Sequence, residues 1–276
     1  SLIQAIKHYF VSTAIRRARG QKTAHSSMLI NVSQYIKKQD DVYRLVNAQV
    51  IEYCDQIDCL DDNPAFEKDL ESIFLEKITH SNSIICQMYP EWSDRLDMPL
   101  WTNVREELRF VAAKVRNEVR VIHSSTDDDY ELNTTRLDYN KYENREKEID
   151  NGLYVIAIGG NTMARGITLE GLVVSYFFRT SNTFDTLMQM GRWFGYRPGY
   201  VDVCRLFVSE EINNWFKAIT IANNELREEF DYLWESKGSP QQYALKVRTS
   251  PGLLITSPLK MFSSQKTAIG SLISSN

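Results

Sequence analysis

Two glycines and one arginine of this chain have the types and the placement needed to handle a phosphate group. Gly159 and Gly160 close an apolar run that begins at Tyr154, and Arg192 lies near the end of a stretch with apolar residues at helical spacing. Backbone N–H groups at such a turn bind anions, and a positioned guanidinium binds phosphate oxygens. The glycine pair alone is weak support, because the chain has neither a GxxxxGK[ST] sequence nor a GxGxxG after a strand. Without a P-loop lysine, the chain cannot by itself hold the β- and γ-phosphates of a nucleotide in the usual way.

The elements that would position these residues are predicted by the hydrophobic pattern. Five apolar runs have the length and composition of buried strands, and helical patterns or crossovers separate them. The runs cover residues 27–32, 119–122, 154–158, 172–178 and 201–208. We therefore predict one α/β domain over residues 1–276, with a mostly parallel sheet and helices on both faces. Within it we expect a helical insertion over about residues 34–118 and an irregular tail over about residues 239–276.

Three helices are predicted outside the insertion. Residues 2–18 have apolar residues at helical spacing and are followed by basic residues, which predicts an amphipathic helix with a cationic end. Residues 184–194 form the helix that carries Arg192. Ser209 precedes two glutamates, which predicts the start of a long helix that ends at about Trp234.

Two polar features allow a structural and a nucleic-acid interpretation. Ser33, at a strand-to-helix corner, is expected to cap the following helix, and it could also hold a nucleic-acid phosphate. A basic run between Arg105 and Arg120 is expected to be a solvated helix face that alternates with glutamates, and a nucleic-acid surface is the alternative.

Composition narrows the classes of protein. The chain has 43% hydrophobic and 25% charged residues, which is typical of a globular domain, and its net charge of −4 confines any nucleic-acid contact to a local groove. No run is apolar enough to cross a membrane, and no secretory signal is present. The four cysteines have no metal-ligand spacing, so we expect reduced thiols, no metal site and a cytoplasmic location. Because the chain begins at Ser1 without a methionine, we expect it to be a domain of a longer protein.

The central stretch resembles a known family of motors. Three successive features are similar to motifs V and VI of superfamily 2 helicases. They are the sequence Met163-Ala164-Arg165-Gly166-Ile167, a buried strand, and Gly191-Arg192 on a helix. More narrowly, IGGNTMARGITLEGLVVSYFFRTS and TLMQMGRWFGYRPGY look like the Z1 domain, which is named for bacterial endonucleases with a helicase-like ATPase. The resemblance is densest over residues 154–200 and extends over most of the chain.

The resemblance implies a second RecA-like lobe, which completes an ATP site whose P-loop and Mg²⁺-binding carboxylates belong to a first lobe. It implies that Arg192 is the first-choice arginine finger and that Arg197 is the second arginine of the same motif. Gln189 would orient these arginines or touch the nucleotide, and Gly166 and Thr168 would line its sugar. An arginine from a separate lobe would couple hydrolysis to lobe closure.

On the nucleic-acid side, the resemblance implies that Gly160, Asn161 and Thr162 contact a DNA backbone phosphate. Arg165 is assigned to the nucleotide side, through an acidic partner across the lobe interface or within the lobe. The chain departs from the family pattern in having Thr168 where an aspartate is usual and Gly160 where a threonine is usual. Its two motif arginines are also five residues apart instead of three.

Taken together, the resemblance implies the second lobe of a DNA-dependent ATPase in a bacterial restriction or defence endonuclease. ATP and Mg²⁺ would be shared with the first lobe, and this chain alone would hydrolyse no ATP. One alternative is a RecA-like module that binds DNA or protein without ATP chemistry. Another is a self-contained nuclease, although the one Glu-x-Lys of the chain, at Glu235 to Lys237, fits a metal-dependent nuclease badly.

Overall fold

The computed structural model describes residues 1–33, 35–122, 137, 139, 152–160, 169–179, 184–191, 197 and 199–236. The chain forms two compact units. The first comprises Ser1–Thr180 and Met190–Ile212, and the second comprises Ser181–Gln189 and Asn213–Asn276.

The first unit is built on a five-stranded sheet in which all pairs of neighbouring strands are parallel. The strands are β1 (Ser26–Asn31), β2 (Val119–Ile122), β3 (Tyr154–Gly159), β4 (Leu172–Phe177) and β5 (Arg205–Val208). Their order across the sheet is β2-β3-β1-β4-β5, so β1 is the central strand. The predicted α/β class with a parallel sheet is thereby confirmed, and it is consistent with a RecA-like fold.

One predicted strand is only half correct. The run over residues 201–208 begins with a 3-10 turn, η5 (Val201–Val203), and only Arg205–Val208 pairs with β4. The reason is Asp202, whose carboxylate is wholly buried and is held by donors from other elements. Its donors, Arg19 and Asn82, hold residues 201–203 in the turn, and the strand begins after it.

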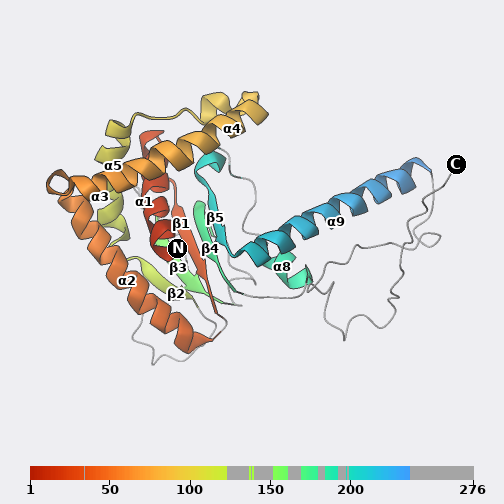
Figure 1. Cartoon of the computed structure of the whole chain (residues 1–276), viewed down its shortest axis with the longest axis horizontal. Helices are drawn as coiled ribbons and strands as arrows, with labels where there is room; N and C mark the ends of the chain where they lie inside the picture. Colours follow the sequence, from red (N-terminus) through yellow and green to blue (C-terminus); the bar gives the residue numbers. More distant parts are fainter. Residues whose placement is uncertain are drawn as a thin grey trace. The chain divides into compact units, whose positions relative to one another are not determined.

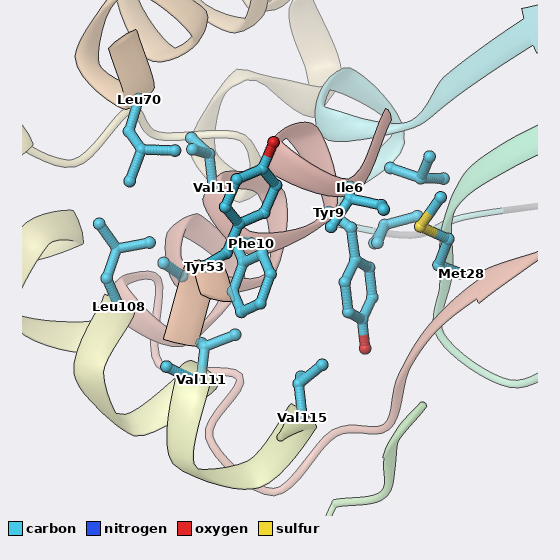
Figure 2. Packing of buried hydrophobic residues seen from close by; sticks show 14 of the residues in the cluster. Ile6, Tyr9, Phe10, Val11, Met28, Tyr53, Leu70, Leu108, Val111 and Val115 are labelled. Carbon is cyan, nitrogen blue, oxygen red and sulfur yellow. The ribbon is translucent and has the colours of Figure 1, made fainter. Parts of the chain in front are cut away.

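Helix α1 (Leu2–Ala18) lies within the protein rather than on its surface. The predicted helix over residues 2–18 with a cationic end is confirmed, since Arg16 and Arg17 lie in its last turn, but its predicted amphipathic character is wrong because every residue from Ala5 to Arg17 is buried. The helix packs between the sheet and helix α5 (Trp101–Val115), and both sides of it are therefore covered. Figure 2 shows α1 side chains such as Phe10 between Leu108 on one side and Met28 of β1 on the other.

Between β1 and β2 the described chain is helical (Figure 1). The elements are α2 (Ile36–Asp58), η1 (Leu60–Asp62), α3 (Pro64–Ser72), η2 (Ile73–Thr79), α4 (His80–Met88), η3 (Pro90–Arg95) and α5. Helices α2 and α5 contact the sheet on the side that α1 covers. The opposite face carries Val155, which packs with Leu153 and Tyr139.

The basic run of the sequence is a paired surface of this helical region. Arg105 contacts Asp61 and Glu67, at 2.5 and 2.7 Å. Arg109 contacts the other oxygen of Asp61 at 2.6 Å, and Arg116 reaches two acids near the end of α2. The helix-face interpretation is therefore supported, with acids from α2, η1 and α3 supplying the negative charges.

The second unit contains most of α8 (Phe184–Gly191) and most of α9 (Glu210–Glu235). Ser209 Oγ accepts the backbone N–H of Ile212 at 3.3 Å, so the predicted start of the long helix is confirmed. Among the described residues, no helix is both long and apolar enough to cross a membrane. All four cysteines are free thiols. The predicted tail over residues 239–276 lies outside the described residues.

Candidate functional site

The carboxyl ends of β3, β1 and β4 lie together at one edge of the sheet, because these neighbouring strands run in the same direction. In the strand order β2-β3-β1-β4-β5, the chain leaves β1 toward β2, at one end of the order. It leaves β4 toward β5, at the opposite end. Open α/β sheets bind ligands outside the carboxyl ends of their strands, at the point where the connections diverge in this way. In this sheet, that point lies between β1 and β4.

Asn31, the last residue of β1, occupies this point. Its side chain is wholly buried, and it belongs to the face opposite α1 because the preceding Ile30 packs into the core cluster. Neither Nδ2 nor Oδ1 of Asn31 has a hydrogen-bond partner among the described residues. Leaving a buried amide unpaired costs about 1–3 kcal/mol, so a group that persists in this state is suited to bind a ligand.

Two of the predicted nucleic-acid residues lie at the same edge. Gly160 is a buried bend directly after β3, and Ser33 follows β1 by two residues. Ser33 Oγ accepts the backbone N–H of Tyr35 at 3.1 Å, and the Ser33 carbonyl accepts Nε2 of Gln39 at 3.0 Å. Helix α2 begins only at Ile36 and has no side-chain cap, so Ser33 stabilises the turn before the helix and the predicted helix cap is wrong. The hydroxyl hydrogen of Ser33 is still able to donate to a phosphate.

A cation completes the edge. Arg179 follows β4, and its backbone N–H donates to the Asn31 carbonyl at 3.2 Å. Its side chain is half-buried, and this burial lowers the pKa of the guanidinium from its usual value. The neighbouring Phe178 is exposed and stacks on the ring of Tyr176, with ring centroids 4.4 Å apart. An amide, a hydroxyl, a glycine turn and a guanidinium at one edge are the groups that bind a phosphate backbone.

Sequence reasoning did not identify Asn31 or Arg179. The signals were present, because Asn31 is an amide inside the apolar run SMLINV and Arg179 is a cation directly after the run LVVSYFF. Neither residue type is unusual at the end of a strand. Only the order of the strands shows that these two positions are neighbours.

Arg197 lies at the other edge of the sheet. Its carbonyl accepts the N–H of Tyr200 at 3.3 Å, and the Tyr200 ring lies under Arg16, with the guanidinium carbon 4.0 Å from the ring centroid. Arg16 in turn donates to the carbonyl of His25, just before β1, and to that of Gly171, just before β4. The structure therefore places Arg197 at the amino ends of the strands, away from Gly160.

Arg197 is close enough to two buried groups to affect their ionisation. Burial raises the pKa of the Tyr200 phenol, and Arg16 and Arg197 oppose this rise. Burial likewise raises the pKa of the Cys204 thiol to about 12, with Arg197 again opposing it. Cys204 is therefore a neutral, unreactive thiol at neutral pH.

Of the remaining predicted site residues, the structure describes Gln189. Gln189 lies on α8 in the second unit, with an exposed side chain. Six predicted site residues lie outside the described residues. For the nucleotide and its sugar they are Arg192, Arg165, Gly166 and Thr168, and for the DNA phosphate they are Asn161 and Thr162. No group of three or more His, Cys, Asp or Glu residues suited to hold a metal occurs within the described ranges.

Comparison with known proteins gives one match. The profile of the Z1 domain matches residues 1–254, which is most of the chain. No curated protein matches the chain, and no solved structure matches it.

Proposed function

The chain belongs to the Z1 domain family, and from this premise we propose that it is the second RecA-like lobe of a DNA-dependent ATPase of the superfamily 2 type. In this proposal, the carboxyl-end edge of the sheet binds the DNA backbone. The segment that contains Arg192 and Arg197 completes an ATP site held mainly by a first lobe. The cleavage activity of the endonuclease would belong to another part of the protein.

The observation that supports this proposal best is the buried Asn31 amide, which has no hydrogen-bond partner among the described residues, at the point where β1 and β4 end. Asn31 offers a buried amide, and Arg179 and Gly160 offer a cation and a glycine turn beside it. These groups do not form an exposed surface of the kind that recognises base edges in a DNA groove. Contacts of this kind bind phosphate and sugar without regard to sequence, which suits a motor that moves along DNA.

The ATP role is supported by the resemblance of the arginine motif. When ATP is bound in the assembled motor, an arginine supplied from this lobe stabilises the negative charge that develops on the transferred phosphate. The chain has no P-loop sequence, and its described residues have no carboxylate cluster for Mg²⁺; in this proposal the first lobe supplies both. The chain alone should therefore show no ATP turnover.

The test is to replace Arg192 or Arg197 by alanine in the full-length protein and to measure DNA-stimulated ATP hydrolysis. Loss of an arginine finger lowers kcat by about 10³-fold or more, and we expect this for at least one of the two variants. For Arg197→Ala, DNA affinity should be unchanged, because Arg197 lies at the opposite edge of the sheet from Asn31. Arg105→Ala is the control: this arginine is paired on the helical surface and should leave turnover unaffected.

A module that binds DNA without ATP chemistry is the second candidate. Two features favour it. The residues at the carboxyl-end edge are not among those assigned to the nucleotide, and Thr168 stands where the family usually has an aspartate. If both arginine variants fold and keep full ATP turnover while DNA binding persists, this second function is the correct one. Mg²⁺-dependent cutting of DNA by residues 1–276 alone would instead support the self-contained nuclease.

A further inference from the structure

Asp202 is a buried carboxylate that neither part of the proposed function uses. It lies in η5 with no exposed surface, and Arg19 binds it with two nitrogens, Nη1 to Oδ1 at 2.9 Å and Nη2 to Oδ2 at 2.6 Å. Asn82 Nδ2 donates to the same Oδ2 at 2.9 Å. Removing a carboxylate from water is costly unless donors of this kind surround it, so the arrangement specifies one position for η5.

The donors of this carboxylate are themselves fixed by the chain around η3. Arg19 also donates to the carbonyls of Asp97 and Leu96, at 2.7 and 3.2 Å. Asn82 donates to the same Leu96 carbonyl at 2.6 Å. The end of α1, helix α4 and the chain after η3 therefore meet at Asp202, and the guanidinium of Arg19 has little freedom to move.

The same end of α1 holds the residues just before Asp202. Gln21 Nε2 donates to the carbonyl of Gly199 at 3.0 Å, and Arg16 lies on the ring of Tyr200. Gly199 has a φ of +75°, and a Cβ at this position would come within 3.0 Å of the Gln21 amide. Arg197 is joined to this structure through its carbonyl, which accepts the Tyr200 N–H.

We propose that Arg19 and Asp202, together with Gln21, position Arg197 for the ATP site of the assembled motor. This inference rests on the proposed function, since it requires that Arg197 acts on ATP. A guanidinium that stabilises transition-state charge must be held within a fraction of an ångström, and a misplacement of about 1 Å costs up to about 10²-fold in rate. Asp202 touches no substrate in this proposal, and it acts through the backbone that leads to Arg197.

Asp202→Asn in the full-length protein tests the proposal. The substitution keeps the size of the side chain and removes the charge that orients Arg19. We expect kcat for ATP to fall about 10- to 100-fold, with KM for ATP and DNA affinity unchanged. Glu107→Gln is the matched control, because Glu107 of α5 forms a part-buried pair, at 2.6 Å, with Arg17 at the same end of α1, and Glu107 has no described hydrogen bond to residues 197–202. It should lower stability and leave kcat unchanged.

A double variant separates positioning from mere stability. If Asp202 acts through Arg197, Asp202→Asn should lower kcat no further once Arg197→Ala is present, while the two losses of stability should add. Additive effects on kcat, or a normal kcat in folded Asp202→Asn, would overturn the inference. If Asp202→Asn does not fold, Gln21→Ala removes the bond to Gly199 without burying a charge, and it must show the same dependence on Arg197.

The outcomes also separate this inference from the proposed function. Loss of turnover in Arg197→Ala with normal turnover in Asp202→Asn would remove the positioning role alone. Normal turnover in Arg197→Ala with collapse in Arg192→Ala would retain the motor and remove the positioning role. Normal turnover in both arginine variants would remove the ATP role and the positioning role together.

Discussion

The two edges of the central sheet use polar groups in opposite ways. At the amino ends of the strands, side chains of α1 bind the carbonyls that the strands leave open. Tyr9 donates to the Ser26 carbonyl at 2.9 Å, and Arg16 donates to the His25 carbonyl at 2.7 Å. At the carboxyl ends, the buried amide of Asn31 has no partner within the described part of the chain.

This difference indicates which edge supports the fold and which edge is available to a ligand. Hydrogen bonds made within the protein hold the amino-end edge in one geometry, and the Asn31 amide, which has no partner among the described residues at the other edge, is able to bind a ligand. Arg197 lies at the amino-end edge, where its carbonyl accepts the N–H of Tyr200. The surface proposed for DNA lies on the other edge.

The largest effect is expected at the amino-end edge, for Gly171→Ala. Gly171 has a φ of +63°, and a Cβ on it would lie 1.8 Å from the carbonyl oxygen of His25, which is a backbone atom and cannot rotate away. The chain would have to separate β1 from the turn before β4. We expect a loss of more than about 4 kcal/mol in the free energy of unfolding, or no folded protein, measured by urea denaturation.

Gly20→Ala is the control for backbone strain alone. Gly20 also has a positive φ, of +89°, but nothing lies within 4 Å of a Cβ placed there. Its loss should be only about 1–2 kcal/mol. If the two variants lose the same stability, close packing at the amino-end edge is not what holds the strands.

An intermediate effect is expected from acid, through His8 in the middle of α1. His8 is buried edge-on against Phe207, and burial, with smaller contributions from Arg205 and Lys77, lowers its pKa from 6.5 to about 4. The unfolded chain therefore binds a proton in the range in which the folded chain does not. Stability should be lost as the pH falls from about 6.5 to about 4, by about 3 kcal/mol in all.

His8→Phe should remove this component, since phenylalanine cannot bind a proton. The measurement is the difference in unfolding free energy between the variant and the unchanged chain at several pH values. We expect the difference to widen in favour of the variant below pH 6.5, the ordinary pKa of histidine. A constant difference would mean that His8 is able to take up a proton within the fold, and that the α1 layer is looser than its burial indicates.

Much of the sheet was predictable from the sequence, because a strand buried on both faces is an apolar run that local composition reveals. Tyr154–Gly159 and Leu172–Phe177 were found to within one residue of their ends. Features decided by distant contacts were not predictable. From the sequence, Arg16 was expected at the cationic end of an amphipathic helix. In the structure it is buried and donates to the carbonyl of His25, just before β1. Asp202 was predicted to be part of a strand, and in the structure Arg19 holds it in a turn.

The candidate site was predictable only in part, for the same reason. Ser33 was chosen because it follows an apolar run, and Gly160 was chosen through the family resemblance; the sheet brings both to one edge. Asn31 and Arg179 become neighbours only through the pairing of β1 with β4, two strands that are far apart in the chain. The distance between Arg197 and that edge also follows from strand order, which no local pattern specifies.

The smallest effect on stability, and the one of opposite sign, is expected for Asn31→Val. Valine suits a buried strand and has no amide to leave unpaired, so the free energy of unfolding should rise by about 1 kcal/mol. DNA affinity should fall about tenfold, equivalent to about 1.4 kcal/mol, in fluorescence anisotropy at fixed salt. Gain of stability with loss of binding is expected of a residue kept for a ligand.

Ser27→Ala, at the other end of the same strand, should give the reverse result. Ser27 Oγ donates to the Glu170 carbonyl at 2.6 Å and shares a hydrogen bond with the Tyr139 hydroxyl, so its loss should lower stability by about 1 kcal/mol and leave DNA affinity unchanged. If Asn31→Val instead lowers stability, the amide supports the fold. The polar groups at the carboxyl-end edge would then be hydrogen-bonded as fully as those at the amino-end edge. If stability rises and DNA affinity does not change, Asn31 is kept for a ligand other than DNA. The two ends of β1 therefore test the comparison within one strand, because the same backbone carries a residue of each kind.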